Sequence, residues 1–249
     1  MRHAFPQHML DEYLREPPGP PLPNWSVERH IEAYRHGFFP MADPLAYLWD
    51  GREVRWYNAD PRAVLPLREE EGLHVPRTIR KRIRRSDFAF RTDRRFRDVV
   101  LACAKPRSAD DLPWINGRIL KMFTLLHEAG WAHSFEAWRR DPQTGEEALV
   151  GGVYGLAIGA AFFAESMFHV PRPRRADGSR HPLDGTDAST TALIALVQHL
   201  QASGFSLIDV QMTTAHTERL GATELPRETF LERLADAASA PPRWSGLPN

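Results

Sequence analysis

The sequence has one cysteine, no net charge and no long apolar run. Cys103 is the only cysteine among 249 residues, which excludes an internal disulfide and a cysteine-rich zinc site. No stretch approaches the ~20 apolar residues that a membrane span needs, and residues 1–24 lack the apolar core of a signal peptide. Hydrophobic residues make up 42% of the chain, enough to bury a core. We therefore expect a soluble, cytoplasmic protein.

Charge is balanced overall but uneven along the chain. The 32 basic and 32 acidic residues give a formal net charge of zero, which argues against a histone-like binder of nucleic acid. Between Arg77 and Arg97, however, there are ten Lys or Arg residues and only two acids. This segment either binds a phosphate backbone or forms a solvated helix face. The basic residues that share one helix face, at a spacing of three or four, are Arg77, Arg80, Lys81 and Arg84.

Motifs for metals and nucleotides are missing. The 11 histidines form no HExxH pattern and have no cysteine partners close by. There is no P-loop, and Gly151–Gly155 does not follow the GxGxxG spacing of a dinucleotide site. We expect no bound metal and no cofactor.

Composition and periodicity predict three parts. Residues 1–24 end in a proline-rich stretch and form an extended lead-in. Residues 25–105 form a small N-terminal α/β domain that holds the basic segment, and residues 106–249 form the larger domain. The larger domain alternates helix, antiparallel strands, helix and strand, which predicts an α+β fold whose order resembles the GNAT type of acyltransferase.

The expected elements follow apolar periodicity and turn residues. A helix that Ser26 caps ends at Gly37, and a helix at 115–129 ends at Gly130. A long loop at 169–187 is followed by a helix that Asp187 or Ser189 caps. Short strands are expected within Trp49–Tyr57 and at Ala63–Leu65. The remaining expected elements are strands at 131–138, 149–154, 157–164 and 205–211 and a closing helix at 226–238.

Two polar residues stand on the expected strand at 205–211. Asp209 and Gln211 are two positions apart, so their side chains share one strand face, whereas Ile208 and Val210 point to the other. Gln cannot titrate, but its carbonyl oxygen can accept a hydrogen bond from an amine, and Asp209 could polarise or orient that amide. The alternative is that both are strand-end residues that satisfy the backbone.

Glu165 stands in the strongly apolar stretch Phe162–Phe168. A buried carboxylate costs free energy unless it is paired. The partner is either a bound cation or one of the chain's arginines, so a substrate contact and a structural salt bridge are both open.

Eight short stretches, in order along the chain, match one known pattern. Together they resemble the leucyl/phenylalanyl-tRNA–protein transferase family over residues 33 to about 231. One tetrapeptide would be weak evidence, but eight in order indicate homology. The stretches are Ala33–Pro40, Asp60–Leu65, Trp114–Ile115, His127–Trp138, Leu149–Gly155, Phe162–Phe168, Leu207–Gln211 and His216–Ala222.

The resemblance implies a small N-terminal domain, a GNAT-like domain and a reaction. The free α-amine of an acceptor protein that begins with Arg or Lys attacks the ester that joins an amino acid to the 3′ adenosine of its tRNA. The amino acid is Leu or Phe, with Met as a third possibility. The new residue marks the acceptor for N-end-rule degradation. The expected partners are therefore Leu-tRNA, Phe-tRNA and such acceptors, and we expect a monomer that needs no membrane.

The resemblance also implies roles for individual residues. Asp209 and Gln211 form a catalytic relay, and Glu165 binds the cationic acceptor N-terminus. Trp114 stacks on the terminal adenine, a contact worth roughly 1–3 kcal/mol, unless it is a core residue. The residues expected to form the aminoacyl pocket, with a plain core as the alternative, are Val153, Phe162, Met167, Leu196 and Ile208. Those expected to bind the tRNA backbone are Arg77, Arg80, Lys81 and Arg84.

Several positions depart from the family pattern. Met41 stands where a second adenine-stacking Trp is usual, so Met41 or Trp49 is expected to complete that contact. The loop at 169–187 is longer than its counterpart. These departures leave open a related transferase with another donor or a cell-wall peptide acceptor, or a non-catalytic module that binds tRNA or protein N-termini. Further departures are Val153, Ala164, Thr190, Leu196 and Thr214.

Overall fold

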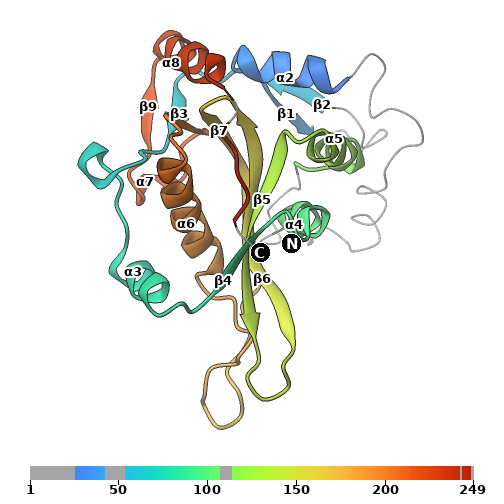
Figure 1. Ribbon diagram of the computed structural model, residues 1–249, viewed down its shortest axis with the longest axis vertical. Helices are drawn as coiled ribbons and strands as arrows, with labels where there is room; N and C mark the ends of the chain where they lie inside the picture. The colour runs from blue at the N-terminus through green and yellow to red at the C-terminus, as the bar shows by residue number, and fades with distance from the viewer. Residues whose placement is uncertain (1–25, 43–53, 107–113, 242, 248–249) are drawn as a thin grey trace, which may run out of the picture.

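The computed structural model of the protein describes residues 26–42, 54–106, 114–241 and 243–247 (Figure 1). Among these residues no helix is long and apolar enough to cross a membrane. The helices are α2 (Val27–Arg35), α3 (Arg77–Arg84), α4 (Phe96–Cys103), α5 (Gly117–Glu128), α6 (Ala188–Ala202), α7 (Ala215–Glu218) and α8 (Arg227–Ser239), with a 3-10 turn at Glu69–Glu71. The strands are β1 (Phe39–Ala42), β2 (Val54–Tyr57), β3 (Arg62–Val64), β4 (Ala89–Thr92), β5 (Ala132–Arg140), β6 (Glu147–Ile158), β7 (Ala161–His169), β8 (Leu207–Gln211) and β9 (Thr223–Leu225).

Seven strands form one sheet in the order β4-β5-β6-β7-β8-β3-β9, and β1 pairs with β2 in a separate two-stranded sheet. Neighbours in the large sheet are antiparallel except β7 and β8, which run parallel. The predicted α+β class with a mostly antiparallel sheet is confirmed. The closer likeness to GNAT acyltransferases remains a prediction.

Helices cover both faces of the large sheet. α6 packs on one face, and α4 and α5 pack on the other (Figure 1). Strand β6 shows how the sequence achieves this. Its successive residues Val153 and Tyr154 join two different core clusters, one with Leu193 of α6 and the other with Phe123 of α5. Because side chains alternate along a strand, both faces of the sheet are buried.

Two strands from the first part of the chain belong to the large sheet. β3 lies between β8 and β9, and β4 forms the opposite edge beside β5. The sheet therefore crosses the division that the sequence predicts at residue 105, and only β1 and β2 of the described strands stay outside it.

Local signals set the helix ends. The Ser26 side chain accepts a hydrogen bond from the Arg29 N–H at 3.3 Å and starts α2. Gly37 follows this helix with a φ of 79°, which favours glycine. Asp187 occupies the N-cap position of α6, but its carboxylate binds Arg82 instead of the helix N–H groups. Asp187 is therefore the N-cap residue, as expected, but its side chain makes no capping hydrogen bond.

The expected break between strands near Gly155 is wrong, because β6 runs unbroken from Glu147 to Ile158. Gly155 has a different role. A Cβ there would lie 2.1 Å from the Phe163 carbonyl oxygen and 2.7 Å from the Phe162 ring. The glycine thus permits a close approach of β7 to β6 at a β-bulge.

Strands β7 and β8 are paired only at their beginnings. The last residues in register are Phe163 and Asp209. Beyond them β7 continues to His169, whereas β8 ends at Gln211. Side chains on the parted ends of these two strands face a cavity.

Candidate active site

A large cavity opens where β7 and β8 part. Its volume is about 1030 Å³, the upper end of the range of roughly 300–1,000 Å³ that is typical of small-molecule sites. Its walls come from β1, the end of α4, β6, β7, the start of α6, and the segment from β8 through α7. The expected site residues that line this pocket are Trp114, Val153, Glu165, Met167 and Gln211.

Behind the pocket, a buried ion pair joins β3 to β8. The side chains of Arg62 and Asp209 are both 0% exposed. Arg62 Nε donates to Asp209 Oδ1 at 2.8 Å and Nη2 donates to Oδ2 at 2.6 Å, while Nη1 donates to the Gly37 carbonyl at 2.8 Å. The guanidinium lies 4.6 Å from the centroid of the Phe39 ring and 4.7 Å from that of Phe230. This bidentate geometry offsets the desolvation of the two charges.

Asp209 contacts Gln211 through the main chain. Its Oδ1 accepts a hydrogen bond from the Gln211 backbone N–H at 2.8 Å, and it does not line the pocket. Gln211 has a φ of 59°, a left-handed conformation that is uncommon for residues other than glycine. Asp209 therefore acts on Gln211 by fixing its backbone, and the expected contact with its side-chain amide is not present.

The neighbours of the Gln211 amide decide its orientation. With its nitrogen donating to the carbonyls of Val210, at 3.0 Å, and Ala164, at 3.1 Å, both ends of the amide are satisfied. The side-chain oxygen then takes the position 3.5 Å from Glu165 Oε1. In this orientation the group that Gln211 offers beside Glu165 is a hydrogen-bond acceptor.

Glu165 is the extra residue of the β-bulge, between Ala164 and Ser166. A bulge changes the direction of its side chain, and the Tyr34 hydroxyl donates to Glu165 Oε1 at 2.8 Å. Burial raises the pKa of Glu165 from 4.5 to about 8; the Tyr34 hydrogen bond opposes this rise and the charge of Asp209 adds to it. The carboxyl is therefore mostly neutral at pH 7.

Tyr34 is suited to its role as a donor. The side chain is 0% exposed, and burial, followed by the neighbouring Glu165, raises the pKa of Tyr34 well above 10. The hydroxyl keeps its proton, so it fixes the Glu165 carboxyl without exchanging a proton with it.

Trp114 lies beside β1 at the pocket. Its carbonyl accepts a hydrogen bond from the Ala42 N–H at 3.0 Å, which brings Trp114 next to Met41, and both side chains line the cavity. Trp49, the other candidate for the second adenine contact, lies outside the described residues. The apolar side chains of Val153 and Met167 form part of the remaining wall.

Three residues expected in the aminoacyl pocket lie in the core instead. Phe162, Leu196 and Ile208 are each 1% exposed, pack between the sheet and α6, and do not line the cavity. Phe162 and Ile208 lie in the core because they are in register on β7 and β8, at a point before these strands part. On α6 it is Leu193 that reaches the pocket.

The rim of the pocket is cationic. Glu165 is the one acid among the described lining residues. Lys105 and Arg219 also line the cavity, and both are exposed. The sequence analysis did not single them out, since isolated basic residues are common on a protein surface.

The basic helix α3 lies outside the pocket but close to its rim. Arg82 donates to Asp187 at 2.6 Å, at the start of α6, whose first turn lines the cavity. Arg80 pairs with Glu69 at 2.7 Å. The expected tRNA-binding residues that are exposed and have no ion pair within the described ranges are Arg77, Lys81 and Arg84.

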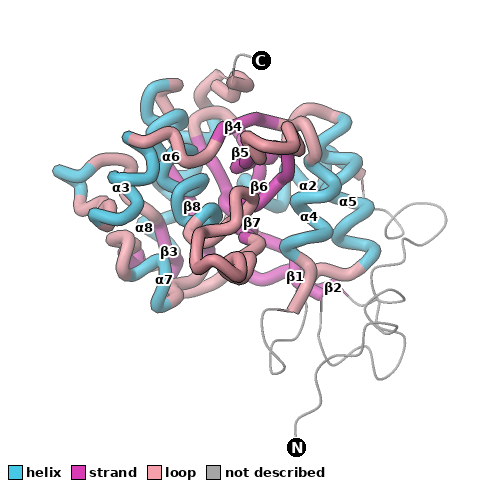
Figure 2. The backbone as a smooth tube through the Cα atoms, turned by 90° about the horizontal axis from the view of Figure 1, so that it is seen from below, coloured by secondary structure: helices cyan, strands magenta, loops and turns pink. Residues whose placement is uncertain are grey.

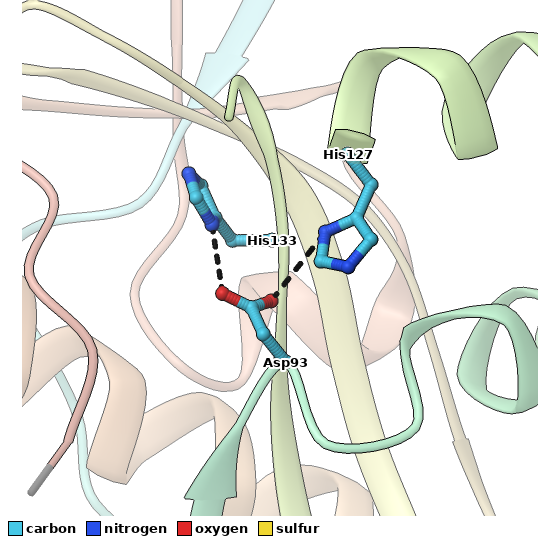
Figure 3. A group of neighbouring side chains, drawn as sticks. All are labelled: Asp93, His127 and His133. Atoms are coloured by element: carbon cyan, nitrogen blue, oxygen red, sulfur yellow. Dashed lines mark hydrogen bonds and ion pairs between the residues drawn. The ribbon is translucent and has the colours of Figure 1, made fainter. Parts of the chain in front are cut away.

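A separate cluster contains Asp93, His127 and His133 (Figure 3). Asp93 Oδ2 lies 2.9 Å from His133 Nδ1, and Asp93 Oδ1 lies 3.9 Å from His127 Nδ1. The residue types could hold a metal ion. However, His127 Nδ1 lies 2.8 Å from the Ala132 carbonyl oxygen. A carbonyl can only accept, so this nitrogen carries a hydrogen and has no lone pair for a metal ion. The cluster fits a hydrogen-bonded link between β4, α5 and β5 better than a metal site.

Comparisons with known proteins identify the family. A family model described as leucyl/phenylalanyl-tRNA protein transferase matches residues 64–235, and the model of that family's N-terminal domain matches residues 24–60. The chain is 42% identical to the leucyl/phenylalanyl-tRNA–protein transferase of Stutzerimonas stutzeri over 93% of this chain and 90% of the relative. It is 40% identical to that of Salinibacter ruber over 86% of this chain and 80% of the relative.

The chain belongs to the leucyl/phenylalanyl-tRNA–protein transferase family. It is therefore an aminoacyltransferase.

Besides the rim residues Lys105 and Arg219, the sequence analysis missed Arg62 and Tyr34, which fix the site from behind in this leucyl/phenylalanyl-tRNA–protein transferase family member. Both stand in stretches that carry the resemblance. Arg62 could have been found from the sequence. An arginine directly before the apolar run Ala63–Leu65 is expected to be buried, and a buried arginine needs an acidic partner. Tyr34 left no such signal, since a tyrosine on the apolar face of a helix indicates only a place in the core.

The buried ion pair gives a stability prediction. Arg62→Met leaves the Asp209 charge buried without a partner, and we expect it to lower the free energy of unfolding by about 3–5 kcal/mol in urea titrations. Asp209→Asn in that background should recover part of this loss, because it removes the charge while its amide oxygen still accepts from Gln211. Arg68→Met, at an exposed arginine, is the control and should change little. Further destabilisation by Asp209→Asn would contradict this view.

The raised pKa of Glu165 gives a second prediction. Between about pH 4.5 and pH 8 the carboxyl ionises in the unfolded chain but stays protonated in the fold, so the parent protein loses stability as pH rises through this window. Gln cannot ionise. The melting temperature of Glu165→Gln minus that of the parent should therefore increase by roughly 10 °C from pH 5 to pH 8 and level off above about pH 9. Glu232→Gln, on the exposed face of α8, is the control. A difference that does not vary with pH would rule out a neutral carboxyl.

Proposed function

We propose that the protein transfers Leu or Phe, and also Met, from aminoacyl-tRNA to the N-terminal α-amine of proteins that begin with Arg or Lys. The modified proteins are marked for N-end-rule degradation in the cytoplasm. The family supports aminoacyl transfer from tRNA to a protein. The observation that supports the finer statement is the pocket, where an amide, one carboxyl, an indole and an apolar wall face the same space.

The reaction requires a neutral amine held against an ester. The amine nitrogen forms a bond to the ester carbonyl carbon, the bond from that carbon to the ribose 3′ oxygen breaks, and the proton lost by the amine ends on that oxygen. Gln211 cannot take up the proton, but its side-chain oxygen can accept a hydrogen bond from the amine and aim its lone pair at the ester. Asp209 keeps Gln211 in place through the backbone contact at 2.8 Å.

Glu165 favours a cationic acceptor. Without a cation beside it, its pKa of about 8 keeps the carboxyl mostly neutral at pH 7. A bound Arg or Lys side chain would lower this pKa and ionise the carboxyl, forming an ion pair away from bulk water. A neutral first residue gives no such ion pair, which supports selectivity for Arg and Lys.

The donor fits the other side of the pocket. Trp114 offers an indole face to the terminal adenine, and Met41 offers a polarizable thioether beside it. Val153, Met167 and Leu193 give the amino-acid side chain an apolar wall. Apolar pockets distinguish one methylene by only ~1–3 kcal/mol, which supports the use of Leu, Phe and Met by one site.

A transfer assay tests the proposal. Labelled Leu-tRNA and Phe-tRNA should each modify a peptide that begins with Arg, whereas an acetylated peptide should take up no label. A peptide that begins with Ser should react far less. Efficient transfer to the Ser peptide would disprove the role of Glu165, and bound tRNA without transfer to any peptide would favour the non-catalytic binding module.

The assay also tests Gln211. We expect Gln211→Ala to lower kcat by about 100-fold, because the amine loses its orienting acceptor, while KM for the aminoacyl-tRNA changes by less than about 3-fold. Gln201→Ala, on the exposed end of α6, is the matched control and should behave like the parent. A normal kcat for Gln211→Ala would remove this residue from the mechanism.

The basic helix predicts a salt effect. Lys81→Glu with Arg84→Glu should weaken tRNA binding, and the slope of log K against log salt should fall by about 2, one for each lost phosphate contact. Arg80→Glu should have a smaller effect, because Arg80 is already paired with Glu69. Filter binding at four salt concentrations measures both quantities. An unchanged slope in the double variant would place the tRNA elsewhere.

A further inference from the structure

A loop of residues 170–187 leaves the pocket rim and returns to it. Ser189 and His169 share a hydrogen bond at 3.2 Å, and the Gly185 N–H donates to the Val170 carbonyl at 2.9 Å, so the two ends of the loop lie together. His169, Val170 and Ser189 also line the cavity. The loop is therefore an arm at the pocket mouth. Figure 2, seen from below, shows the arm in the middle of this face, with α3 to its left and α4 to its right.

The arm is held in one shape by Asp184, which is 4% exposed. Its carboxylate accepts hydrogen bonds from the Arg172 N–H at 2.9 Å, from Arg180 Nε at 2.6 Å, and from the N–H and hydroxyl of Thr186 at 3.1 and 2.9 Å. Burial alone would raise the pKa of Asp184, but these donors bring it below its usual range. An arm tied in this way presents its outer side chains at fixed places.

Two of the three acids of the arm are paired with an arginine within the fold. Asp184 binds Arg180 and Asp187 binds Arg82. Asp177 accepts a hydrogen bond from the Ser179 N–H and keeps its charge at the surface.

Two cations of the arm have no acidic partner. The exposed side chains of Arg172 and Arg174 make no ion pair with any residue in the described ranges. The Arg174 guanidinium donates to the Gly178 carbonyl at 2.8 Å, which positions it without neutralising its charge. The arm, whose two ends lie at the pocket mouth, therefore presents two guanidinium groups without an ion pair to solvent.

We infer that this arm binds the phosphates of the tRNA acceptor strand as it leaves the pocket, with Arg172 and Arg174 as the contacts. The inference rests on the proposed function, in which the 3′ adenosine occupies the pocket. The strand attached to that adenosine must pass the mouth, where it meets the arm and, beyond the Arg82–Asp187 link, the basic helix α3. Guanidinium groups bind phosphate oxygens in a bidentate manner, which suits this contact.

The charge of the arm favours the donor over the acceptor. An acceptor protein that begins with Arg or Lys would bring a cation toward two unneutralised guanidinium groups, which is unfavourable. A nucleic acid carries one negative charge per nucleotide along each strand and gains from the same groups.

The test compares two donors with one double variant. The variant Arg172→Ala/Arg174→Ala should lower kcat/KM for aminoacyl-tRNA by about 10-fold or more and reduce the salt slope of tRNA binding by about 1.5. For Leu or Phe esterified to adenosine alone, which has no strand to contact, kcat/KM should stay within 2-fold of the parent. Arg233→Ala is the control, at an exposed arginine of α8 on the far side of the molecule from the arm (Figure 1).

The outcomes separate this inference from the proposed function. Equal losses with both donors, or no loss with either and an unchanged salt slope, would overturn the role of the arm. If the parent transferred an amino acid from neither donor, the proposed function would fail. The salt slope of tRNA binding would still decide whether Arg172 and Arg174 contact tRNA.

Discussion

The geometry of the pocket depends on the buried ion pair between Arg62 and Asp209. Burying two charges costs several kcal/mol per ion, and an incomplete set of hydrogen bonds would leave that cost without an offset. Here Arg62 donates to both oxygens of Asp209 and to the Gly37 carbonyl. One guanidinium therefore fixes β3, β8 and the turn after α2 relative to one another. Because α2 carries Tyr34 and β8 carries Gln211, the two groups that flank Glu165 are both held by this pair.

The two side chains to which we assign roles in the proposed reaction, Glu165 and Gln211, stand on irregular backbone. Without the bulge, Glu165 would pair with a residue of β6. If β8 were regular, it would continue past Gln211 alongside β7. The bulge at Glu165 and the left-handed φ of 59° at Gln211 end this regularity. Each conformation is unfavourable by itself and persists only because neighbouring contacts determine it. The buried Arg62–Asp209 pair supplies such contacts, so the stability of the core maintains the strained geometry of the site.

The sequence predicts the secondary structure better than it predicts the contacts. Periodicity and turn residues were sufficient for the α+β class and for most helices and strands, because these signals are local. It could not show that Arg62 meets Asp209, 147 positions away, since such a pair leaves no spacing signal. Likewise, alternation marks Phe162 and Ile208 as apolar, but only the point at which β7 and β8 part decides that they lie in the core. The same applies to Arg80, where a surface contact with Glu69 removes one cation from a face that looks uniformly basic.

Electrostatics in the pocket separates the two proposed substrates. The donor is a polyanion and the acceptor carries a cation, so a cavity with a single sign of charge would repel one of them. The described rim bears Lys105 and Arg219, and the interior bears one acid, Glu165. Because the pKa of that acid is about 8, the interior carries little negative charge until a cation binds beside it. A phosphate that approaches the pocket first meets the positive charges of the rim. In the proposed function, the charge that selects the acceptor thus develops only when the acceptor is bound, which would allow one neutral chain to recognise partners of opposite sign.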